Sequence, residues 1–297
     1  MKFISPKYWP LWLLFIILRI VVILPFPILI KLGEAIGLLL YHANIRNRRY
    51  AEINIDKAFP DITKNKRDEL VKENFKSTAI TLFELPLSWW ASTRRLKKLY
   101  TTEGLTLIKE TLKNGHGAIM MGGHFTSMLM CGRLLAIELP FNILIMPANN
   151  KLFEAVMEHY RNKHYAGVIN TNDIRTLVKA LKRNEICWFS PDQDLGLGNS
   201  VFAPFMGIQA ATITSTARLA KLSKAPLVPI KFNRTNNNKK YSIELSEHWN
   251  DFPSGDDVAD ATRVNQFIES HIRNYPEQYV WVHRRFFTRP DGEEHFY

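Results

Sequence analysis

The sequence predicts an α/β fold: a mixed, largely parallel sheet flanked by helices, preceded by a membrane-anchor helix and a helical N-terminal region. From about residue 100 onward, short apolar runs of strand length alternate with segments of helical period, which is the pattern of a parallel sheet. Before that point, residues 9–30 are almost entirely apolar. We therefore divide the 297 residues into an anchor (1–42) and one domain (43–297), in which a helical lead-in (43–100) precedes an α/β core (101–297).

The apolar run at residues 9–30 is long enough to cross a bilayer, which takes ~20 residues. Arg19 is costly at mid-membrane unless its side chain reaches the interface, and Pro25 and Pro27 are expected to kink the far end. Aromatic residues near both ends favour an anchor over the alternative, a buried core helix. No small-residue cleavage site follows, so we expect the segment to be retained.

The chain carries 39 Lys and Arg against 28 Asp and Glu, a net charge of +11. Such a surface suits nucleic acid or an anionic membrane, and the anchor, with no nucleic-acid motif in the sequence, favours the membrane. Basic residues stand on both sides of the apolar run, so they set its orientation only weakly. Cys131 and Cys187 form neither a CxxC pair nor a zinc spacing, which predicts two buried thiols in a body that faces the reducing cytoplasm.

The lead-in predicts two amphipathic helices, at residues 47–59 and 64–83, with Asp61 or Thr63 capping the second. Residues 85–91 follow and contain a proline and a tryptophan pair. This aromatic cluster fits either the protein core or a surface that rests on lipid headgroups.

The core predicts strands and helices in alternation. The expected strands are residues 117–121, 141–146, 186–189, 227–232 and 241–245. The expected helices are residues 104–114, 126–136, 151–163, 173–183, 212–222 and 258–275. The polar run TNNNKK, residues 235–240, predicts a hairpin turn. Open sheets of this class bind ligands at the carboxyl ends of their strands.

A histidine lies at one such strand end. His124 follows the strand at residues 117–121 and two glycines, and it precedes a helix whose first turn holds Thr126 and Ser127. A histidine presented in this way suits a general base. On position alone, a helix-capping or core histidine is an equal alternative.

A pair of acids lies at a second strand end, in PDQD (residues 191–194) after the strand at residues 186–189. Two acids in a loop that contains glycines suit the orientation of a base or the binding of a metal, although capping a turn is the commonest role of such a pair. If the two strands are neighbours, the carboxylate of Asp192 can reach the ring of His124.

Other catalytic motifs find little support. The chain has no G-x-S-x-G elbow and no GKS or GKT loop, and Gly196-Leu-Gly198 lacks the third glycine and the helix of a nucleotide loop. Cys131 is expected in the core rather than as a nucleophile. Arg161, late in the helix at residues 151–163, suits contact with a phosphate-bearing substrate, with a solvated surface arginine as the alternative.

Several stretches together resemble the bacterial lipid A late acyltransferases, the lauroyl and myristoyl transferase group of the lysophospholipid-acyltransferase-like superfamily. They are the apolar anchor, NRRYAEINIDKAFPD (47–61), GGHF (122–125), MPANN (146–150), PDQD-x-G (191–196), VFAPFMG (201–207) and EQYVWVHRRFFTRPDGE (277–293). The resemblance covers essentially the whole chain, and the last stretch is the most specific.

The resemblance implies an enzyme attached to the bacterial inner membrane by a single N-terminal anchor, with its catalytic body facing the cytoplasm. Such enzymes move an acyl chain from an acyl-carrier-protein thioester to a hydroxyl of the lipid A precursor. The implied partners are therefore acyl carrier protein, the precursor and inner-membrane lipids, and not nucleic acid. Because the nucleophile is a hydroxyl and the leaving thiol departs readily, we expect no metal and no cofactor.

The resemblance also implies roles for individual residues. In the family signature His-x4-Asp/Glu, the histidine deprotonates the acceptor hydroxyl, and His124 matches it. Asn149, Arg161, Asp192 and Asp194 match positions that the family uses or retains in its site, which makes Asp192 a candidate catalytic acid and the other three candidate substrate-binding residues.

Leu129 stands where the signature has its acid. A leucine there closes the cleft or leaves a dry pocket, and loss of the carboxylate that orients a catalytic histidine costs roughly 10⁴ in rate in the serine-protease example. Two interpretations follow. Either Asp192 or Asp194 substitutes for the missing acid, or the chain is a catalytically impaired, lipid-binding paralogue.

Overall fold

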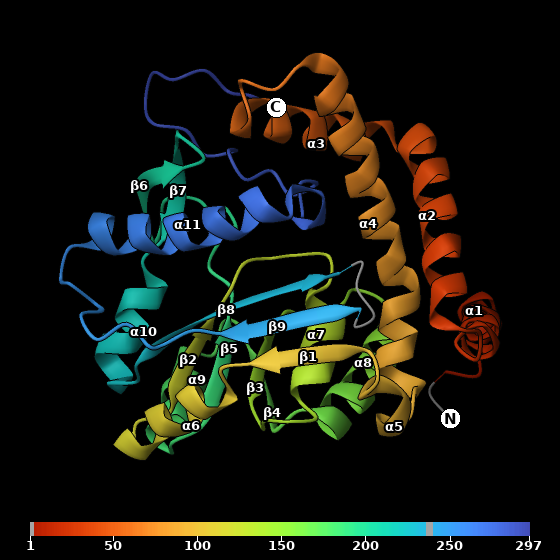
Figure 1. Cartoon of the computed structure of the whole chain (residues 1–297), viewed down its shortest axis with the longest axis horizontal. Coiled ribbons are helices and arrows are strands. Elements are labelled where there is room, and N and C mark those ends of the chain that lie inside the picture. Colours follow the sequence, from red (N-terminus) through yellow and green to blue (C-terminus); the bar gives the residue numbers. More distant parts are fainter. Residues whose placement is uncertain (1–2, 236–239) are drawn as a thin grey trace.

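The computed structural model describes residues 3–235 and 240–297. It has a layer of long N-terminal helices and an α/β core built on a seven-stranded sheet (Figure 1). The predicted fold class, a mixed and largely parallel α/β fold with a helical N-terminal region, is confirmed. The turn predicted at residues 235–240 falls mostly outside the described residues.

The N-terminal layer consists of a 3-10 turn (Pro6–Tyr8) and helices α1 (Trp9–Val21), α2 (Phe26–Ala43), α3 (Ile45–Ala58), α4 (Lys64–Trp90) and α5 (Thr93–Leu96). Thr63 caps α4, because its hydroxyl accepts a hydrogen bond from the backbone N–H of Lys66. α4 continues through Pro86 and takes in the tryptophan pair. Trp89 is buried and Trp90 is half-buried, so this cluster packs in the interior.

The predicted anchor is two helices, and the expectation of one continuous helix over residues 9–30 is wrong. α1 ends at Val21, and Pro25 and Pro27 begin α2, since proline ends one helix and suits the first turn of the next. The 13 residues of α1 extend about 20 Å, less than the ~30 Å hydrocarbon core of a bilayer. In the part of the chain that the structure describes, α2 is the one helix both long and apolar enough to cross a membrane.

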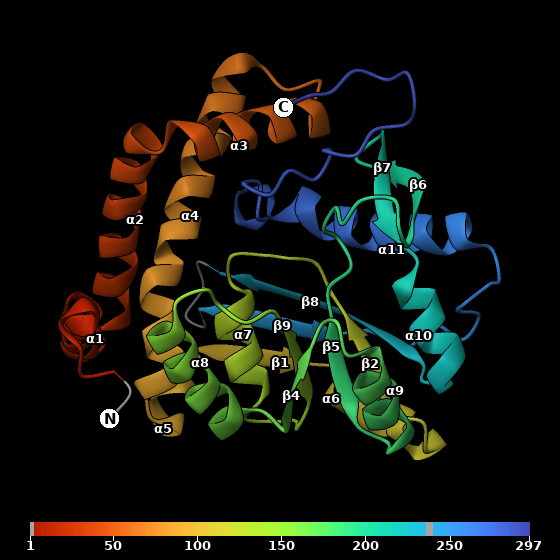
Figure 2. The same ribbon diagram turned by 180° about the vertical axis from the view of Figure 1, so that it is seen from behind.

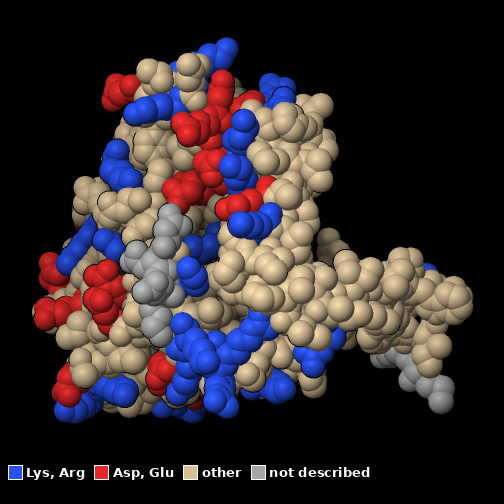
Figure 3. All heavy atoms as spheres, turned by 45° about the vertical axis from the view of Figure 1, so that its right-hand side comes forward, with Lys and Arg blue, Asp and Glu red and all other residues tan. Residues whose placement is uncertain are grey.

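α1 projects from the body as an arm whose surface is almost free of charged side chains (Figure 3). Phe15 is its one buried residue and packs against Trp89 and Phe153. Arg19 donates to the carbonyl of Trp90 and lies over its ring, so this charge rests on the body. Leu11 and Leu18 are half-buried, and the other large apolar side chains of the arm are exposed: Trp9, Trp12, Leu13, Leu14, Ile16, Ile17 and Ile20. A helix with so little polar surface requires apolar surroundings.

α2 packs against α4, and two glycines make the close approach possible. A Cβ atom added to Gly33 would lie 2.7 Å from the Cα of Ile80, and one added to Gly37 would lie 2.4 Å from the Cα of Lys76. Either distance requires the backbone of α4 to move, so only glycine fits. One face of α2 is therefore part of the folded body, while the opposite face is exposed.

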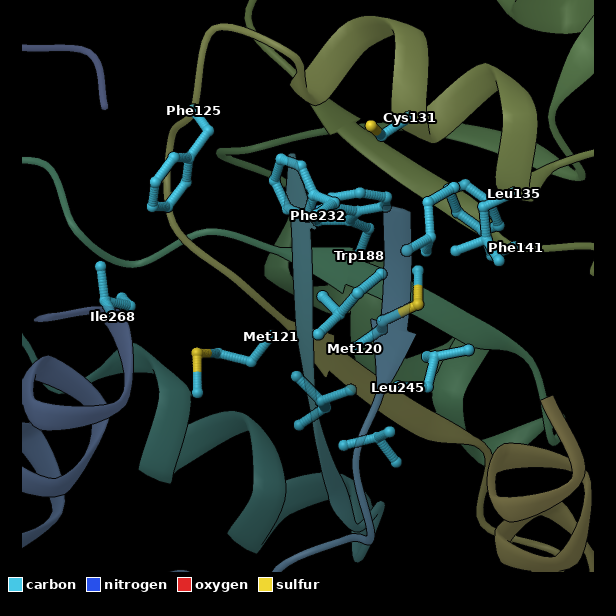
Figure 4. Packing of buried hydrophobic residues seen from close by; sticks show 14 of the residues in the cluster. Met120, Met121, Phe125, Cys131, Leu135, Phe141, Trp188, Phe232, Leu245 and Ile268 are labelled. Carbon is cyan, nitrogen blue, oxygen red and sulfur yellow. The ribbon is translucent and has the colours of Figure 1, made fainter. Parts of the chain in front are cut away.

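The sheet has the strand order β1-β9-β8-β2-β5-β3-β4. Its strands are β1 (Tyr100–Glu103), β2 (Ala118–Met121), β3 (Asn142–Ile145), β4 (Gly167–Asn170), β5 (Ile186–Phe189), β8 (Leu227–Arg234) and β9 (Tyr241–Leu245). β8 and β9 pair antiparallel, and the other described pairs are parallel. In β2, Met120 and Met121 point to opposite sides and both are fully buried (Figure 4). A strand covered on both faces has a continuous apolar sequence, which is why this one is recognisable.

The helices of the core are α6 (Leu105–Thr111), α7 (Met128–Leu135), α8 (Lys151–His164), α9 (Ile174–Lys182), α10 (Ser215–Ser223) and α11 (Asp257–Asn274), with 3-10 turns at Leu112–Asn114 and Pro276–Gln278. Seen from behind, α8 and α9 lie in front of the sheet (Figure 2). Each predicted core helix is present, with its ends moved by a few residues.

Four strands were not predicted. β1 and β4 are the two edge strands of the large sheet. β6 (Ser200–Phe205) and β7 (Ile208–Ile213) form a separate antiparallel hairpin, so residues 212–213, predicted as the start of a helix, belong to a strand. The hairpin is held by α11, because the amide of Asn265 donates to the carbonyl of Pro204 and the hydroxyl of Thr212. A contact between segments so far apart has no local sequence signal.

Both cysteines are buried and free, as predicted. Burial raises the pKa of Cys187 to about 12, so its thiol stays protonated. Cys131 lies on α7 close to Trp188 and Phe232 (Figure 4). These thiols are core residues and not nucleophiles.

α1 is an exposed apolar arm, whereas α2 packs against α4, so truncations that remove one or both helices should have different effects. Removal of residues 1–20 should reduce membrane attachment and leave a folded body, because the α2–α4 contact is kept. Removal of residues 1–43 should instead give an aggregating protein, since it uncovers the apolar face of α4. Membrane fractionation and thermal melting of the detergent-extracted proteins measure both effects. Full-length protein in the soluble fraction without detergent would contradict the role given to the arm.

Candidate active site

Two strand ends meet at the centre of the sheet. β2 and β5 pair in parallel with Met121 opposite Phe189, so the segments after them leave the same edge of the sheet. The first segment carries His124 and the second carries Asp192. The sheet thus brings together two residues that are 68 positions apart in the chain.

Two glycines allow the segment before His124 to lie close to its neighbours. A Cβ atom added to Gly122 would lie 2.9 Å from the carbonyl oxygen of Ile230 on β8. One added to Gly123 would lie 2.9 Å from the side chain of Ile268 on α11 and 3.4 Å from a carboxylate oxygen of Asp192. A side chain at either position would be crowded by these atoms, which explains why both residues before His124 are glycines.

The carboxylate of Asp192 holds His124 by two hydrogen bonds. Its Oδ1 lies 2.6 Å from Nδ1 of the ring, and its Oδ2 accepts from the backbone N–H of the same residue at 2.8 Å. Because a carboxylate only accepts, Nδ1 carries the proton and Nε2 is left with a free lone pair. The side chain of Asp192 is fully buried, whereas that of His124 is 28% exposed. His124 is not a helix cap, since α7 begins at Met128 with Ser127 as its N-cap residue.

The two groups shift each other's pKa. For Asp192, burial alone would raise the pKa, but the charge of His124, its two hydrogen bonds and the nearby hydroxyl of Tyr279 outweigh burial and lower the pKa to about 2. For His124, burial alone would lower the pKa, but the charge and hydrogen bond of Asp192 outweigh it and raise the pKa. The pair is an ionised carboxylate that orients an imidazole and stabilises its protonated form.

Residues 277–288, called the C-terminal segment below, form a third wall of the site. The hydroxyl of Tyr279 helps to lower the pKa of Asp192, and Val280 donates its backbone N–H to the carbonyl of His124 at 3.0 Å. Asn74 of α4 donates to the carbonyls of Glu277 and Tyr279 and fixes this segment on the N-terminal layer. Sequence reasoning missed Tyr279, and the only signal for it was its place in the EQYVWVHRRFFTRPDGE stretch.

A buried ion pair lies behind residues 122–127, the loop that carries His124 and is called the histidine loop below. Arg234 on β8 forms a bidentate ion pair with Glu84 on α4, with Nε and Nη2 donating at 2.5 and 2.8 Å. Its Nη1 donates to the hydroxyls of Ser77 and Thr126. Thr126 is two residues after His124, so this network ties the loop to α4 and β8. The sequence analysis missed Glu84 and Arg234, because neither lies in a motif.

The remaining predicted site residues are dispersed. Asp194 accepts from the backbone and hydroxyl of Thr288 at 2.7 and 2.8 Å, so it fastens the C-terminal segment. Arg161 on α8 pairs with Glu154 at 2.9 Å. Asn149 is exposed in the bend before α8. Of the five predicted binding and catalytic residues, the structure joins only His124 and Asp192 directly.

Leu129 lies in the first turn of α7 and is 44% exposed. It lines a largely apolar cavity of about 120 Å³ together with Arg161. The walls of this cavity come from α4, α7, β3, β5 and α8, and include Trp89, Met128, Ile143, Met157 and Trp188. The leucine therefore faces an apolar space next to the helix that follows the histidine loop.

The sequence matches the family model described as bacterial lipid A biosynthesis acyltransferase over residues 1–288. It is 34% identical to the lipid A biosynthesis palmitoleoyltransferase of Escherichia coli K12 over 297 residues, which is 100% of this chain and 97% of the relative. It is 31% identical to the lauroyltransferase of the same organism (97% and 95%) and 26% identical to the myristoyltransferase (98% and 91%).

The pH dependence of the free energy of unfolding tests whether Asp192 is ionised in the folded protein. Asp192→Asn should lower the free energy of unfolding by about 2 kcal/mol at neutral pH, because the carboxyl pKa falls from 3.8 to about 2 on folding and one unit is worth ~1.4 kcal/mol. A lowered pKa gives stability that is present above pH 3.8 and is lost as the pH falls through the folded value. The difference from wild type should therefore shrink between about pH 4 and pH 2 in urea unfolding curves.

Asp251→Asn, at an exposed carboxylate, is the matched control and should change neutral stability little. A difference between wild type and Asp192→Asn that stays constant down to about pH 2 would mean that Asp192 is not held as an ion.

Proposed function

Because this chain belongs to the bacterial lipid A biosynthesis acyltransferase family, we propose that it transfers a fatty acyl chain from an acyl-carrier-protein thioester to a hydroxyl of a lipid A precursor or related glycolipid. Family membership makes the protein an acyltransferase of lipid A biosynthesis. The donor, the catalytic residues and the orientation in the membrane are the proposed part. The hydrogen-bonded pair of His124 and Asp192 is the observation that carries it.

In the proposed reaction His124 is the general base. Its Nε2 takes the proton of the acceptor hydroxyl while the oxygen attacks the thioester carbonyl, and the C–S bond breaks as the tetrahedral intermediate collapses. The imidazolium then returns the proton to the departing thiolate. Asp192 holds the reactive tautomer and stabilises the imidazolium, so it takes the part of the acid that Leu129 replaces.

The substrate-binding residues in this proposal act in two ways. One nitrogen of the Arg161 guanidinium pairs with Glu154, and its other N–H groups remain as donors. Since Arg161 lies on the cavity wall, these donors suit contact with an anionic part of a substrate. Asn149 is exposed in the bend before α8, the helix that carries Arg161, and suits contact with the same part of a substrate. Asp194 contributes by positioning, through its bonds to Thr288.

The proposed location is the inner membrane, with the body on the cytoplasmic side. The exposed apolar arm and the candidate span α2 support membrane attachment. The two free, buried thiols agree with a reducing compartment, and the net charge of +11 suits an anionic membrane surface.

Leu129 supports a second candidate function, a lipid-binding paralogue without transferase activity. One experiment separates the two. Purified protein is incubated with acyl-carrier-protein thioester and lipid A precursor, and the mass of the glycolipid product is measured. An added acyl mass supports transfer, whereas bound lipid without product supports the paralogue.

The base and its partner are tested by substitution. His124→Ala should abolish transfer, and Asp192→Asn should lower it by roughly 10⁴, because the amide no longer fixes the reactive tautomer. Asp192 raises the pKa of His124, so this pKa should be lower in Asp192→Asn. The acid limb of the pH–rate profile for any residual activity should therefore lie at lower pH than in wild type. His116→Ala, at an exposed histidine, is the control. Normal transfer by His124→Ala would remove this mechanism.

A separate substitution tests whether Asp192 has taken over the role of the missing acid. Leu129→Glu should fold and should not raise transfer, because Asp192 already occupies Nδ1 of His124 while residue 129 faces the cavity. Product mass per unit time is compared with that of Leu129→Gln, which has nearly the same size without the charge. A large gain that is specific to the glutamate would show that wild type works with an unfilled acid position.

A further inference from the structure

One arginine of the cavity is buried without a counter-ion. Arg133 lies on α7, is 7% exposed and lines the cavity. Its Nε has no hydrogen-bond partner, and no carboxylate among residues 3–235 and 240–297 forms an ion pair with it. Burial lowers its pKa, opposed only by the hydroxyls of Tyr165 and Tyr100. A buried cation without a partner is costly, and an anionic ligand would remove that cost.

The other deeply placed arginines of the core have hydrogen-bond acceptors, although Nε of Arg285, like that of Arg133, has no partner. Arg234 pairs with Glu84, and Arg285 donates to the carbonyl of Ala211 at 2.7 Å and the hydroxyl of Thr212 at 2.9 Å. Burial of an arginine in this fold therefore comes with acceptors. Arg133 departs from that pattern, and it does so on the wall of a cavity.

The cavity has the chemistry of an amphiphile site. Its lining is mostly apolar, with aromatic and aliphatic side chains around the buried guanidinium. Nε2 of His164, also on the wall, is buried without a partner, and burial lowers the pKa of this histidine to about 4, so the ring is neutral at pH 7. The second arginine on the wall, Arg161, is paired with Glu154. One cation without a counter-ion and one neutral polar atom in a mostly apolar space match a small anionic head followed by methylene groups.

The dimensions of the cavity indicate where such a chain would run. About 120 Å³ is comparable to the ~150 Å³ engineered cavity that holds benzene, so a head group and a few methylenes fit inside. Leu129 lies one helical turn before Arg133 and is 44% exposed, which places it at the mouth. The rest of a longer chain would leave the cavity past Leu129.

We propose that this cavity binds a free fatty acid, with the carboxylate on Arg133 and the chain along the apolar wall toward Leu129. A carboxylate suits the planar fork of one guanidinium, whereas a phosphate group needs more donors and a more polar lining than this cavity gives. The cavity shares Arg161 with the proposed substrate site. The proposal differs from the acyl-transfer step because the ligand is the unactivated acid and its carboxylate lies on Arg133, which has no part in the His124–Asp192 pair.

The test compares laurate with dodecan-1-ol, which has the same chain and no charge. Full-length protein is placed in phosphatidylcholine nanodiscs without donor or acceptor, and binding is followed by the fluorescence of the tryptophans, two of which line the cavity, and by thermal shift. Wild type should bind laurate saturably and at least tenfold more tightly than the alcohol. Arg133→Met should lose this preference and should bind both ligands alike.

A second variant keeps the proposal testable if Arg133→Met does not fold. Leu129→Glu places a carboxylate four residues before Arg133 on the same face of α7, where it can neutralise the guanidinium. It should therefore weaken laurate binding at least tenfold, while Leu129→Gln should retain it.

Three results would overturn the proposal: no saturable binding of laurate by wild type, equal affinity for laurate and dodecan-1-ol, or unchanged laurate affinity in the folded Arg133→Met or Leu129→Glu variant. Because no acyl donor is present, the outcome is independent of whether the protein transfers acyl chains.

Discussion

The fully buried carboxylate of Asp192 is the constraint around which the centre of this protein is organised. An ion at that depth is tolerated only when hydrogen bonds replace the water it has lost. His124 supplies two of those bonds, and the hydroxyl of Tyr279 also favours the ionised carboxylate, so the ends of β2 and β5 and the C-terminal segment converge on one group. The geometry that the proposed chemistry would use is the same geometry that keeps a buried charge from destabilising the fold.

A second buried charge fixes the same loop from behind. Arg234 and Glu84 satisfy each other, and the remaining donors of the arginine reach Ser77 and Thr126. The histidine loop is thus held between two ionic centres, one on the carboxyl edge of the sheet and one against α4. Placing reactive groups on a loop that rigid elements clamp from both sides reduces the reorganisation needed during reaction.

The sequence predicted those parts that depend on local pattern or on the geometry of parallel sheets. β5 and β9 have the predicted ends, since an apolar run between polar breaks leaves few alternatives. The approach of Asp192 to His124 follows because neighbouring parallel strands end at one edge. Glu84, Arg234 and Tyr279 escaped notice because their partners lie far away in the chain, and no periodicity records such pairings. The anchor was misjudged because two prolines that suggest a kink in fact separate two helices.

The glycine contact between α2 and α4 has a consequence for how the molecule meets a bilayer. α4 is one continuous helix of 27 residues, about 40 Å long, and it carries Asn74, Ser77 and Glu84, which hold the site. With Gly33 and Gly37 pressed on that helix, the apolar N-terminal segment is joined to the site without a flexible tether. If this segment lies in the membrane, as proposed, the fold sets the height of His124 above the membrane and its tilt. In the proposed reaction, a lipid substrate that diffuses in two dimensions would meet the histidine at a constant depth, and its search would be reduced to lateral position and rotation about the membrane normal.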